Sequence, residues 1–388
     1  RMVAALALSI LGLSAAAHAQ TVTMAWDANR EPNIAGYILY YGTVPGQYTG
    51  SVPVGNRTQY TFTMPDASRV YYFAVQAINT GGLGGGLSSE VNSARTPLSD
   101  LVFDLGSRGL WSLTDRLAFR QISTSVAKSM TTGDLDGNRI DELIVDFGTG
   151  AGIWVRWNGV DWVRLHEVSA IRMTTGDLDN NGRAELIVDF PAAGVYIFWN
   201  GTTWQPFHSL NTLRLMVVDI NGGGGDLIIE YAGYGVWVRY NNGVWARIHE
   251  LNTTLMAVGD FDGNGRGDIA MSFGVNGIFQ FRNGWQWVQV TTAQPSKLAA
   301  GDVDGVRGTE LVAEFAPFGI WMLSNAGWTQ LHSLNTANIA TGDYDGNGRS
   351  DVVADFGPGG GTWVWSTAAG WRQASSESAR AIVTGNLN

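Results

Sequence analysis

The sequence predicts an all-β protein in which two kinds of antiparallel unit follow one another along the chain. The 388 residues include 51 Gly and 16 Trp, a composition that disfavours long helices and requires large packed surfaces. Short apolar segments alternate with turn residues throughout, as they do in antiparallel sheets. From residue 100 onward one pattern returns at a nearly constant interval, which indicates a repeat architecture.

The composition excludes several classes of function. The formal net charge is −10 and charged residues make up only 15% of the chain, so no basic face can offset the repulsion of nucleic-acid phosphates. Cysteine is absent, which excludes disulfides, a thiolate nucleophile and Cys-ligated zinc. Hydrophobic residues make up 45% of the chain, enough for a large core. We therefore expect a folded protein without a nucleic-acid partner.

The N-terminal region has the pattern of a secretory signal peptide. Residues 2–16 form one apolar run, and the small residues Ala17 and Ala19 flank His18 after it. The run is too short for a comfortable membrane span, although a buried core helix is an alternative. We assign residues 1–19 to a signal peptide and expect a secreted, extracellular bacterial protein without a membrane span.

Residues 20–97 predict a small antiparallel sandwich. Val22, Met24 and Trp26 alternate as in a half-buried strand, and further strands are expected at 34–41, 60–64 and 70–77. On the last of these, the side chains of one face are Tyr71, Phe73, Val75 and Ala77.

The segment resembles a fibronectin type III domain. The resemblance rests on Trp26, on Gly36-Tyr37, on Tyr71 at the place of the tyrosine corner, and on the ending from Asn79 to Val91. Such a domain implies a spacer without chemistry of its own. The Gly-rich stretch 81–86 is expected to form one mobile hairpin loop.

Residues 98–388 contain a repeat of about 42 residues. Asp-rich loops begin every 41 to 43 residues, at Asp134, Asp177, Asp219, Asp260, Asp302 and Asp343. Two aromatic positions recur seven times each. The first comprises Trp111, Trp154, Tyr196, Trp237, Phe279, Trp321 and Trp363, and the second comprises Phe119, Trp162, Trp204, Trp245, Trp287, Trp328 and Trp371. A turn separates the two, often Asn-Gly, the strongest short hairpin signal.

Four antiparallel strands per repeat predict one blade of a β-propeller. Six whole repeats are present, and the segment from Asp100 lacks a first strand that residues 381–384 can supply. The two ends would complete one blade, leave no free sheet edge and make a seven-bladed propeller at 98–388. A parallel β-solenoid is the alternative architecture.

The loops have the ligand pattern of a hard cation site. In the fourth loop, oxygen side chains occupy positions 1, 3, 5 and 9 of nine, Gly stands at 6, and position 7 supplies a backbone carbonyl. The candidate ligands are Asp260, Asp262, Asn264, Arg266 and Asp268 in the fourth loop, Asp343, Asp345, Asn347, Arg349 and Asp351 in the sixth, Asp177, Asp179, Asn181, Arg183 and Glu185 in the second, and Asp134, Asp136, Asn138 and Glu142 in the first.

This order of residues resembles the FG-GAP and VCBS-type calcium-loop propellers. The resemblance implies about three to four structural Ca²⁺ ions. In the first loop Arg139 replaces the Gly at position 6, so a distorted site is expected there. The third loop, with Asp219 and Asn221, and the fifth, with Val306 at position 5, are not expected to bind metal. In the closing blade, where Asn386, Asn388 and Asp100 take loop positions, a metal is doubtful.

Two further rings of polar residues recur. Carboxylates follow the second strands at Asp104, Asp146, Asp189, Glu230, Glu314 and Asp355, with Ser272 as the exception. They accept backbone N–H bonds of the next turn or, alternatively, line a sugar-binding face. Histidines recur after the fourth strands at His166, His208, His249 and His332, and we interpret them as packing residues between blades.

The turns after the second strands vary most between repeats and carry Tyr234 and Phe318. Aromatic side chains on rigid loops can stack on sugars, and nearby carboxylates can accept hydrogen bonds from sugar hydroxyl groups. We therefore expect the face of the propeller that carries these turns to bind a glycan or a surface partner. The expected binding residues are Tyr234, Phe318, Asp146, Asp189, Glu230, Glu314 and Asp355. The first hypothesis is a non-enzymatic recognition or adhesion protein. Alternatives are a self-associating subunit of an extracellular assembly or filament, and a polysaccharide-active enzyme such as a lyase.

Overall fold

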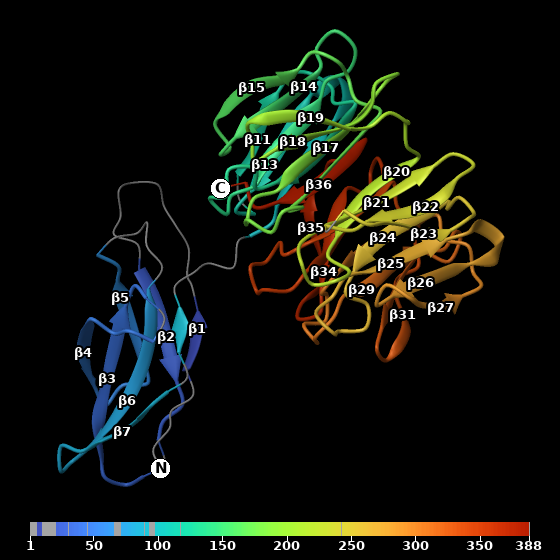
Figure 1. The fold of residues 1–388 in the computed structure, drawn as a ribbon. Helices are drawn as coiled ribbons and strands as arrows, with labels where there is room; N and C mark the ends of the chain where they lie inside the picture. Colours follow the sequence, from blue (N-terminus) through green and yellow to red (C-terminus); the bar gives the residue numbers. More distant parts are fainter. Residues whose placement is uncertain are drawn as a thin grey trace. The chain divides into compact units, whose positions relative to one another are not determined.

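The computed structural model describes residues 6–9, 21–29, 31–44, 46–65, 71–88, 90–92, 98–116, 118–241 and 243–387. The chain divides into two compact units, Arg1–Arg95 and Thr96–Asn388 (Figure 1). Within the described residues no helix is long and apolar enough to cross a membrane. The structure is all-β apart from two 3₁₀ turns, Gly106–Arg108 and Gly274–Asn276.

The first unit consists of two antiparallel sheets. One has the order β1-β2-β5, with strands β1 Leu6–Ser9, β2 Thr21–Trp26 and β5 Gln59–Thr63. The other has the order β4-β3-β6-β7, and β8 also pairs with β6; its strands are β3 Ile34–Gly42, β4 Gly50–Gly55, β6 Tyr72–Asn79, β7 Gly84–Leu87 and β8 Val91–Asn92.

The core of this unit follows the predicted alternation. Val22, Met24 and Trp26 of β2 are buried in one cluster with Tyr71 and the inward face of β6. The Gly-rich stretch differs from the expectation, because Gly84–Leu87 forms a strand that pairs with β6 instead of belonging wholly to a loop. Most of the predicted signal peptide, and Val70 of the predicted fourth strand, lie outside the described residues.

The second unit consists of seven four-stranded antiparallel sheets, named here in chain order. The first to third sheets are β12 Ser129–Gly133, β13 Glu142–Asp146, β14 Ile153–Trp157 and β15 Asp161–His166; β16 Arg172–Gly176, β17 Glu185–Phe190, β18 Gly194–Trp199 and β19 Thr203–His208; and β20 Arg214–Val218, β21 Asp226–Tyr231, β22 Gly235–Arg239 and β23 Trp245–His249.

The fourth to sixth sheets are β24 Leu255–Gly259, β25 Asp268–Ser272, β26 Ile278–Arg282 and β27 Gln286–Thr291; β28 Lys297–Gly301, β29 Glu310–Glu314, β30 Ile320–Ser324 and β31 Gly327–His332; and β32 Asn338–Gly342, β33 Asp351–Asp355, β34 Thr362–Ser366 and β35 Gly370–Ser375. The closing sheet is β36 Ala381–Gly385, β9 Asp100–Asp104, β10 Leu110–Thr114 and β11 Ala118–Ser123.

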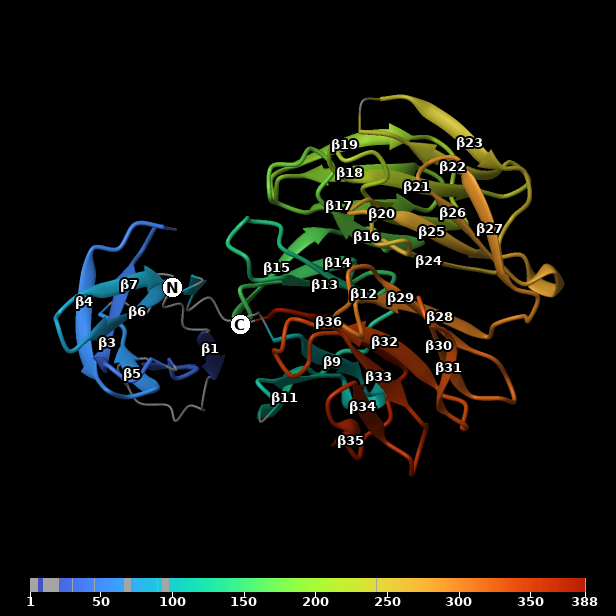
Figure 2. The same ribbon diagram turned by 90° about the horizontal axis from the view of Figure 1, so that it is seen from below.

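The seven sheets form a ring. Each first strand contacts the first strands of its two neighbouring sheets, in the circular order β12, β16, β20, β24, β28, β32, β36 and back to β12. In Figure 2 these strands lie toward the middle of the ring and the fourth strands lie outside. The cores lie between neighbouring sheets. One cluster, for example, combines Ile144 and Val155 of the first sheet with Leu186 and Val188 of the second.

The predicted pairing between the first and last strands of the second unit is present. Strand β36 is antiparallel to β9, with Ala381 opposite Asp104 and Thr384 opposite Leu101. The first and last strands of the second unit, β9 and β36, therefore share one sheet. Every sheet of the ring has four strands.

A circle of hydrogen bonds joins the loops of neighbouring sheets. In each loop the residue at position 8, or its equivalent, donates its backbone N–H to the carbonyl of position 1 in an adjacent loop. The seven pairs are Ala184 to Asp134, Gly225 to Asp177, Gly267 to Asp219, Thr309 to Asp260, Ser350 to Asp302, Ser99 to Asp343 and Asp141 to Asn386.

Because consecutive strands are antiparallel, alternate connections lie on opposite faces of the ring. The loop face carries the loops between first and second strands and the turns between third and fourth strands. The turn face carries the turns between second and third strands and the connections from each fourth strand to the next sheet. The Asp-rich loops lie on the loop face, and Tyr234 and Phe318 lie on the turn face.

Candidate functional site

Five of the Asp-rich loops bring three carboxylates together. In each, one oxygen from every member lies within 4.8 Å of the others. The groups are Asp134, Asp136 and Glu142; Asp177, Asp179 and Glu185; Asp260, Asp262 and Asp268; Asp302, Asp304 and Glu310; and Asp343, Asp345 and Asp351. The predicted acidic ligands of the first, second, fourth and sixth loops are thus adjacent in space.

The fourth loop illustrates how the backbone holds these groups. Asp260 accepts the N–H groups of Asn264 at 3.0 Å and Gly265 at 2.7 Å. The Asn264 side-chain oxygen accepts the N–H of Arg266 at 2.7 Å. Buried Asp268, at the start of β25, accepts the N–H of Phe261 at 3.0 Å. The loop is therefore a preformed cradle of oxygen atoms.

The electrostatics of the loops fit a bound cation. Burial, and then the neighbouring carboxylates, raise the pKa of Glu142, Glu185 and Asp351 to about 7 in each case and that of Asp268 to about 6. The Asp351 Oδ1 atom is buried without a hydrogen-bond partner among the described residues. An all-oxygen donor set with converging carboxylates is the chemistry that Ca²⁺ prefers.

The first loop does not show the distortion expected from Arg139. The Arg139 N–H donates to Asp134 Oδ2 at 2.7 Å, as the N–H of Gly265 does to Asp260 at 2.7 Å. Arg139 reaches this geometry with φ of 72°, close to the 89° of Gly265. A non-Gly residue in the left-handed region is strained, so the cost of the substitution falls on the backbone rather than on the ligand geometry.

The fifth and third loops were both predicted not to bind metal, but only the fifth brings three carboxylates together. In the fifth, Glu310 at position 9 joins Asp302 and Asp304, so the three carboxylates gather without a position-5 ligand. Counting eight residues from each first Asp would have found Glu310. In the third, the Asn221 amide lies 3.4 Å from Asp226, the position-9 equivalent, and no third carboxylate is present.

Three asparagines form hydrogen bonds to carboxylates of the Asp-rich loops. From the sequence, these residues were predicted only to form hairpin turns. Asn158, Asn200 and Asn283 each follow the third strand and donate from Nδ2 to the position-3 carboxylate of their own sheet, at 3.2, 3.3 and 2.7 Å. In the sixth sheet Thr367 stands at this place. In the other three sheets the backbone N–H of the Asn donates to the position-9 carboxylate, and Asp351 Oδ1 lacks the equivalent donor among the described residues.

The carboxylates that follow the second strands are buried. Asp146, Asp189, Glu230 and Asp355 are fully buried, and Glu314 is 2% exposed. Each accepts an N–H from the connection that leads to the next sheet: the donors are Ala170, Thr212, Thr253, Ala379 and Thr336, at 2.5 to 2.9 Å. These carboxylates therefore accept backbone N–H bonds, as in the first of the two alternatives, but mainly from the connection to the next sheet; among the described residues, only Asp146 and Asp355 of this set also accept one from the next turn, from Gly148 and Gly357.

Basic residues at the start of the first strands pair with this ring. Arg214 lies 2.8 Å from Glu230, and Lys297 lies 2.8 Å from Glu314. Lys128 lies 3.7 Å from Asp146, so both lysines of the chain are in ion pairs. In the fourth sheet both partners are replaced, because Leu255 stands opposite Ser272.

The four histidines pack between neighbouring sheets, as predicted. His249 of the third sheet lies 4.2 Å from Phe273 and 5.2 Å from Trp287 of the fourth, measured between ring centroids. Its Nδ1 atom accepts the N–H of Leu251 at 3.1 Å. An Nδ1 that accepts a hydrogen bond carries no proton, so the neutral ring presents its donor at Nε2.

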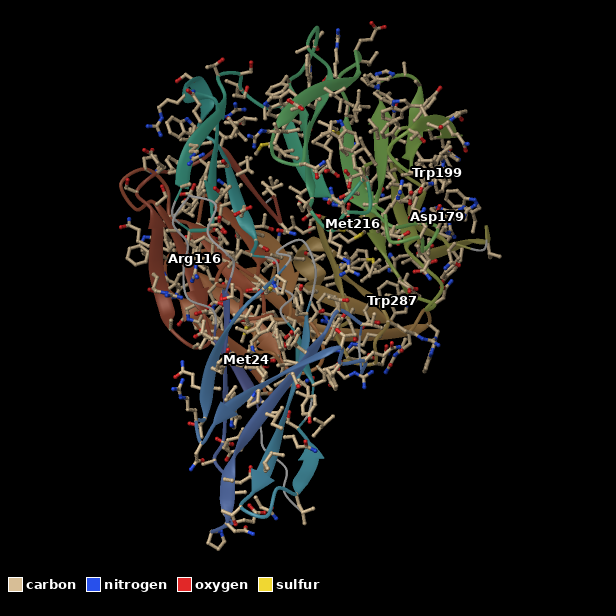
Figure 3. All side chains as sticks on the ribbon, turned by 90° about the vertical axis from the view of Figure 1, so that its left-hand side faces the viewer. Met24, Arg116, Asp179, Trp199, Met216 and Trp287 are labelled. Carbon is tan, nitrogen blue, oxygen red and sulfur yellow. The ribbon has the colours of Figure 1, made fainter. Side chains whose placement is uncertain are left out.

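A cavity of about 580 Å³ opens beside this histidine on the turn face. Its lining residues are His249, Leu251, Phe273, Val275, Asn276, Phe279, Trp287, Gln289 and Thr292, none of which carries a formal charge when the histidine is neutral. Trp287 is labelled in Figure 3. From the sequence, Phe279 and Trp287 were identified only as members of the two recurring aromatic positions, and this cavity was not identified.

The predicted binding residues Tyr234 and Phe318 are exposed, at 61% and 65%, in the turns that follow β21 and β29. They do not line the cavity of the fourth sheet. A second cavity, of about 560 Å³, lies on the loop face and is lined by Asp179, Trp199 and Arg239 among others. A third, of about 370 Å³, lies between the first strands, with Met216 in its wall (Figure 3).

Comparisons with known proteins connect the ring to solved structures. No protein-family model matches the sequence, and no curated protein matches it. Two structures of BBS1N in complex with ARL6DN, one soaked with mercury and one with lead, match with TM-scores of 0.47 and 0.48 at 12% identity, covering 62% and 66% of this chain and 80% and 84% of theirs. A structure describing specific recognition of non-reducing terminal N-acetylglucosamine by an Agrocybe aegerita lectin matches with a TM-score of 0.57 at 15% identity, covering 76% of this chain and 97% of the lectin. This likeness identifies the ring of antiparallel sheets as a β-propeller fold.

Proposed function

We propose that the chain is a secreted, calcium-stabilised, non-enzymatic recognition protein. Its first unit is a fibronectin type III-like spacer, and its second is a seven-bladed propeller of the FG-GAP or VCBS type. The two-sheet first unit and the closed circle of seven loop–loop hydrogen bonds support these assignments.

The loops with converging carboxylates hold calcium in this proposal. The acidic ligands are those of the first, second, fourth and sixth loops, to which Glu310 adds the fifth, and the backbone carbonyls of Arg183, Arg266 and Arg349 complete three of the sites. Bound Ca²⁺ supplies positive charge to the buried carboxylates. The ions are structural, since equivalent loops surround the ring.

The turn face binds a carbohydrate in this proposal, and the cavity of the fourth sheet carries it. Phe279 and Trp287 offer the flat apolar surface on which the C–H face of a pyranose stacks. His249, Asn276 and Gln289 offer hydrogen-bond donors and acceptors to its hydroxyl groups. The absence of formal charge on the lining favours a neutral sugar. The likeness to a lectin supports the same class of ligand.

The test is a glycan array with the full chain in calcium. Trp287→Ala should weaken binding, because it removes one wall of the cavity, whereas Trp285→Ala should leave it unchanged. Trp285 is 74% exposed and lies in the turn between β26 and β27 on the loop face, so it controls for loss of a tryptophan. Tyr234→Ala and Phe318→Ala, on the turn face, should weaken binding and leave the melting temperature nearly unchanged. If Trp287→Ala binds like the parent, or no glycan binds at all, the proposed function is wrong.

Self-association is a second candidate, because Val275, Tyr234 and Phe318 leave apolar groups in solvent on the same face, with Val275 84% exposed. A sizing column distinguishes the two. A monomer at all concentrations would argue against an assembly subunit, and a Phe318-dependent oligomer that ignores glycans would favour it.

A further inference from the structure

Four sheets end in the same short sequence, whose recurrence the fold does not explain. The first, second, third and fifth sheets end in His, a variable residue and then Val or Leu: His166-Glu167-Val168, His208-Ser209-Leu210, His249-Glu250-Leu251 and His332-Ser333-Leu334. The apolar side chain remains in solvent each time, with exposures of 41% for Val168, 46% for Leu210, 51% for Leu251 and 59% for Leu334. We call these segments the His–Leu units.

The local turn does not require the histidine. In every His–Leu unit Nδ1 accepts the N–H two residues on, at 3.0 to 3.2 Å. In the other three sheets a hydroxyl oxygen does the same: Ser123, Thr291 and Ser375 accept the N–H of Ser125, Ala293 and Glu377 at 3.0 to 3.1 Å. Where the histidine is absent, the residue two positions on is Ser125, Ala293 or Glu377, although Val126, one position further in the closing sheet, is 36% exposed. At this place the histidine and a Val or Leu two positions on occur together or not at all.

The packing between sheets does not require the histidine either. Where Ser123 and Thr291 take its place, the aromatic pairs of the following sheets still contact each other, with Phe147 5.6 Å from Trp162 and Phe315 5.4 Å from Trp328. The His–Leu units add a third ring to such a pair. The histidine lies 4.2 to 5.0 Å from the Phe or Tyr and 5.2 to 5.9 Å from the Trp, and the triads are His166, Phe190 and Trp204; His208, Tyr231 and Trp245; His249, Phe273 and Trp287; and His332, Phe356 and Trp371.

The tryptophans of the fourth strands differ in whether the indole N–H donates a hydrogen bond to the preceding sheet. Trp162 and Trp328, which follow sheets without a His–Leu unit, donate their Nε1–H to Ile122 and Val290 carbonyls at 3.2 Å. Three tryptophans in the triads, Trp204, Trp245 and Trp287, donate no such bond within the part of the chain that the structure describes. Trp371 is the exception, because it donates to the Leu331 carbonyl at 2.9 Å. Most triads therefore keep a polar donor for another molecule.

We infer that each His–Leu unit, with the aromatic pair of the next sheet, forms one of four equivalent subsites for a neutral pyranose. The inference rests on the proposed function and deepens it: the protein is multivalent, and the cavity beside His249 is one member of a set. The exposed Val or Leu and the Trp contact the apolar face of the sugar, and the histidine Nε2–H donates to a hydroxyl group. Four weak subsites on one face would bind a surface with repeated sugars by avidity.

The test uses the full chain in calcium, labelled with ¹⁵N-histidine, and four probes: the methyl glycosides of glucose, galactose, mannose and N-acetylglucosamine. One glycoside should shift the Nε2 signals of four histidines together, assigned by single His→Ser variants. Serine keeps the turn, as Ser123 and Ser375 do, so His249→Ser should fold with an unchanged melting temperature and bind one sugar fewer by native mass spectrometry. Leu251→Ser should do the same, and Leu83→Ser, 70% exposed in the first unit, should change nothing.

The outcomes separate the two proposals. A single bound sugar that shifts only His249 overturns multivalency and leaves the proposed function standing. An array that shows glycan binding while none of the four glycosides shifts any histidine also overturns these subsites alone. An array without any binding overturns the proposed function itself, and the subsites with it.

Discussion

The backbone N–H of Leu387 donates a hydrogen bond of 3.1 Å to the carboxylate of Asp100, across 287 residues of sequence. The bond repeats one made inside other sheets, where Phe261 donates to Asp268 and Leu135 donates to Glu142. The other oxygen of Asp100 accepts the N–H of Asp115 at 3.0 Å. One buried carboxylate thus links the first and last segments of the second unit in the closing sheet.

Removal of the last strand should open the ring. Deletion of residues 380–388 leaves β9 without its partner β36 and exposes the buried residues Leu101 and Phe103. We expect aggregation or a large loss of stability, measured by sizing chromatography and thermal melting. Asp100→Ala, which leaves two buried N–H groups without an acceptor, should cost about 1–3 kcal/mol. A deletion that remains monomeric with the parent's melting temperature would contradict closure.

Calcium should stabilise the second unit. Each independent site adds about 2.7 kcal/mol when free calcium is about a hundredfold above its dissociation constant. Chelation should therefore lower the melting temperature by many degrees, and Asp260→Ala with Asp343→Ala should reproduce part of the loss. Asp219→Ala in the third loop is a control that should not change the response to calcium. An identical melt in excess chelator, with metal shown to be absent, would refute the proposal.

Replacing Arg139 with glycine should stabilise the protein. Arg139 has φ of 72°, a region that costs an L-residue about 1–2 kcal/mol. Arg139→Gly removes that strain, at the expense of about 0.5–1 kcal/mol of added freedom in the unfolded chain. The net gain should be about 0–1.5 kcal/mol, measured by urea unfolding in calcium. The reverse change, Gly265→Arg, should destabilise, and an Arg139→Gly variant less stable than the parent would exclude a strained backbone at this position.

The Lys297–Glu314 pair should make stability depend on pH. Burial raises the pKa of Glu314, but the hydrogen bonds from Lys297, Ser296 and Thr336 outweigh it and hold the pKa below its ordinary value. Such a group stabilises the fold above its unfolded pKa and loses the contribution as the pH falls through the lowered folded pKa. Lys297→Met should therefore cost about 1–3 kcal/mol at neutral pH and less in acid.

Arg108→Met provides the matched control, since the Arg108–Glu377 pair is largely exposed and should be worth less than about 1 kcal/mol. Equal losses for Lys297→Met at neutral and acidic pH would show that Lys297 acts by packing alone.

Much of the fold could be read from local patterns. The alternation of Val22, Met24 and Trp26 predicted β2, and the spacing of the Asp-rich loops predicted the strands on either side of them. The carboxylates of the metal loops were also predictable, because Asp260, Asp262 and Asp268 are close in sequence. Glu310 was missed because Val306 broke the pattern at position 5, although the backbone of that loop still gathers its carboxylates.

The cavity beside His249 could not be read in the same way, because its lining comes from two sheets. His249 ends the third sheet, and Phe273 and Trp287 belong to the fourth, so their contact depends on how the two sheets pack against each other. The carboxylates after the second strands were open to two interpretations for the same reason. Their burial depends on the connection to the next sheet, as the bond from Thr212 to Asp189 shows.

The sequence by itself determined the strand order, the repeat and the carboxylates that converge in four of the Asp-rich loops, since these depend on residues a few positions apart and on the two-residue period of a strand. Only the tertiary structure decided which polar groups are buried, which aromatic rings border a cavity and how Asp100 meets Leu387. Those features arise where separate sheets pack against each other, and the free energy of burial there depends on neighbours that local sequence does not specify.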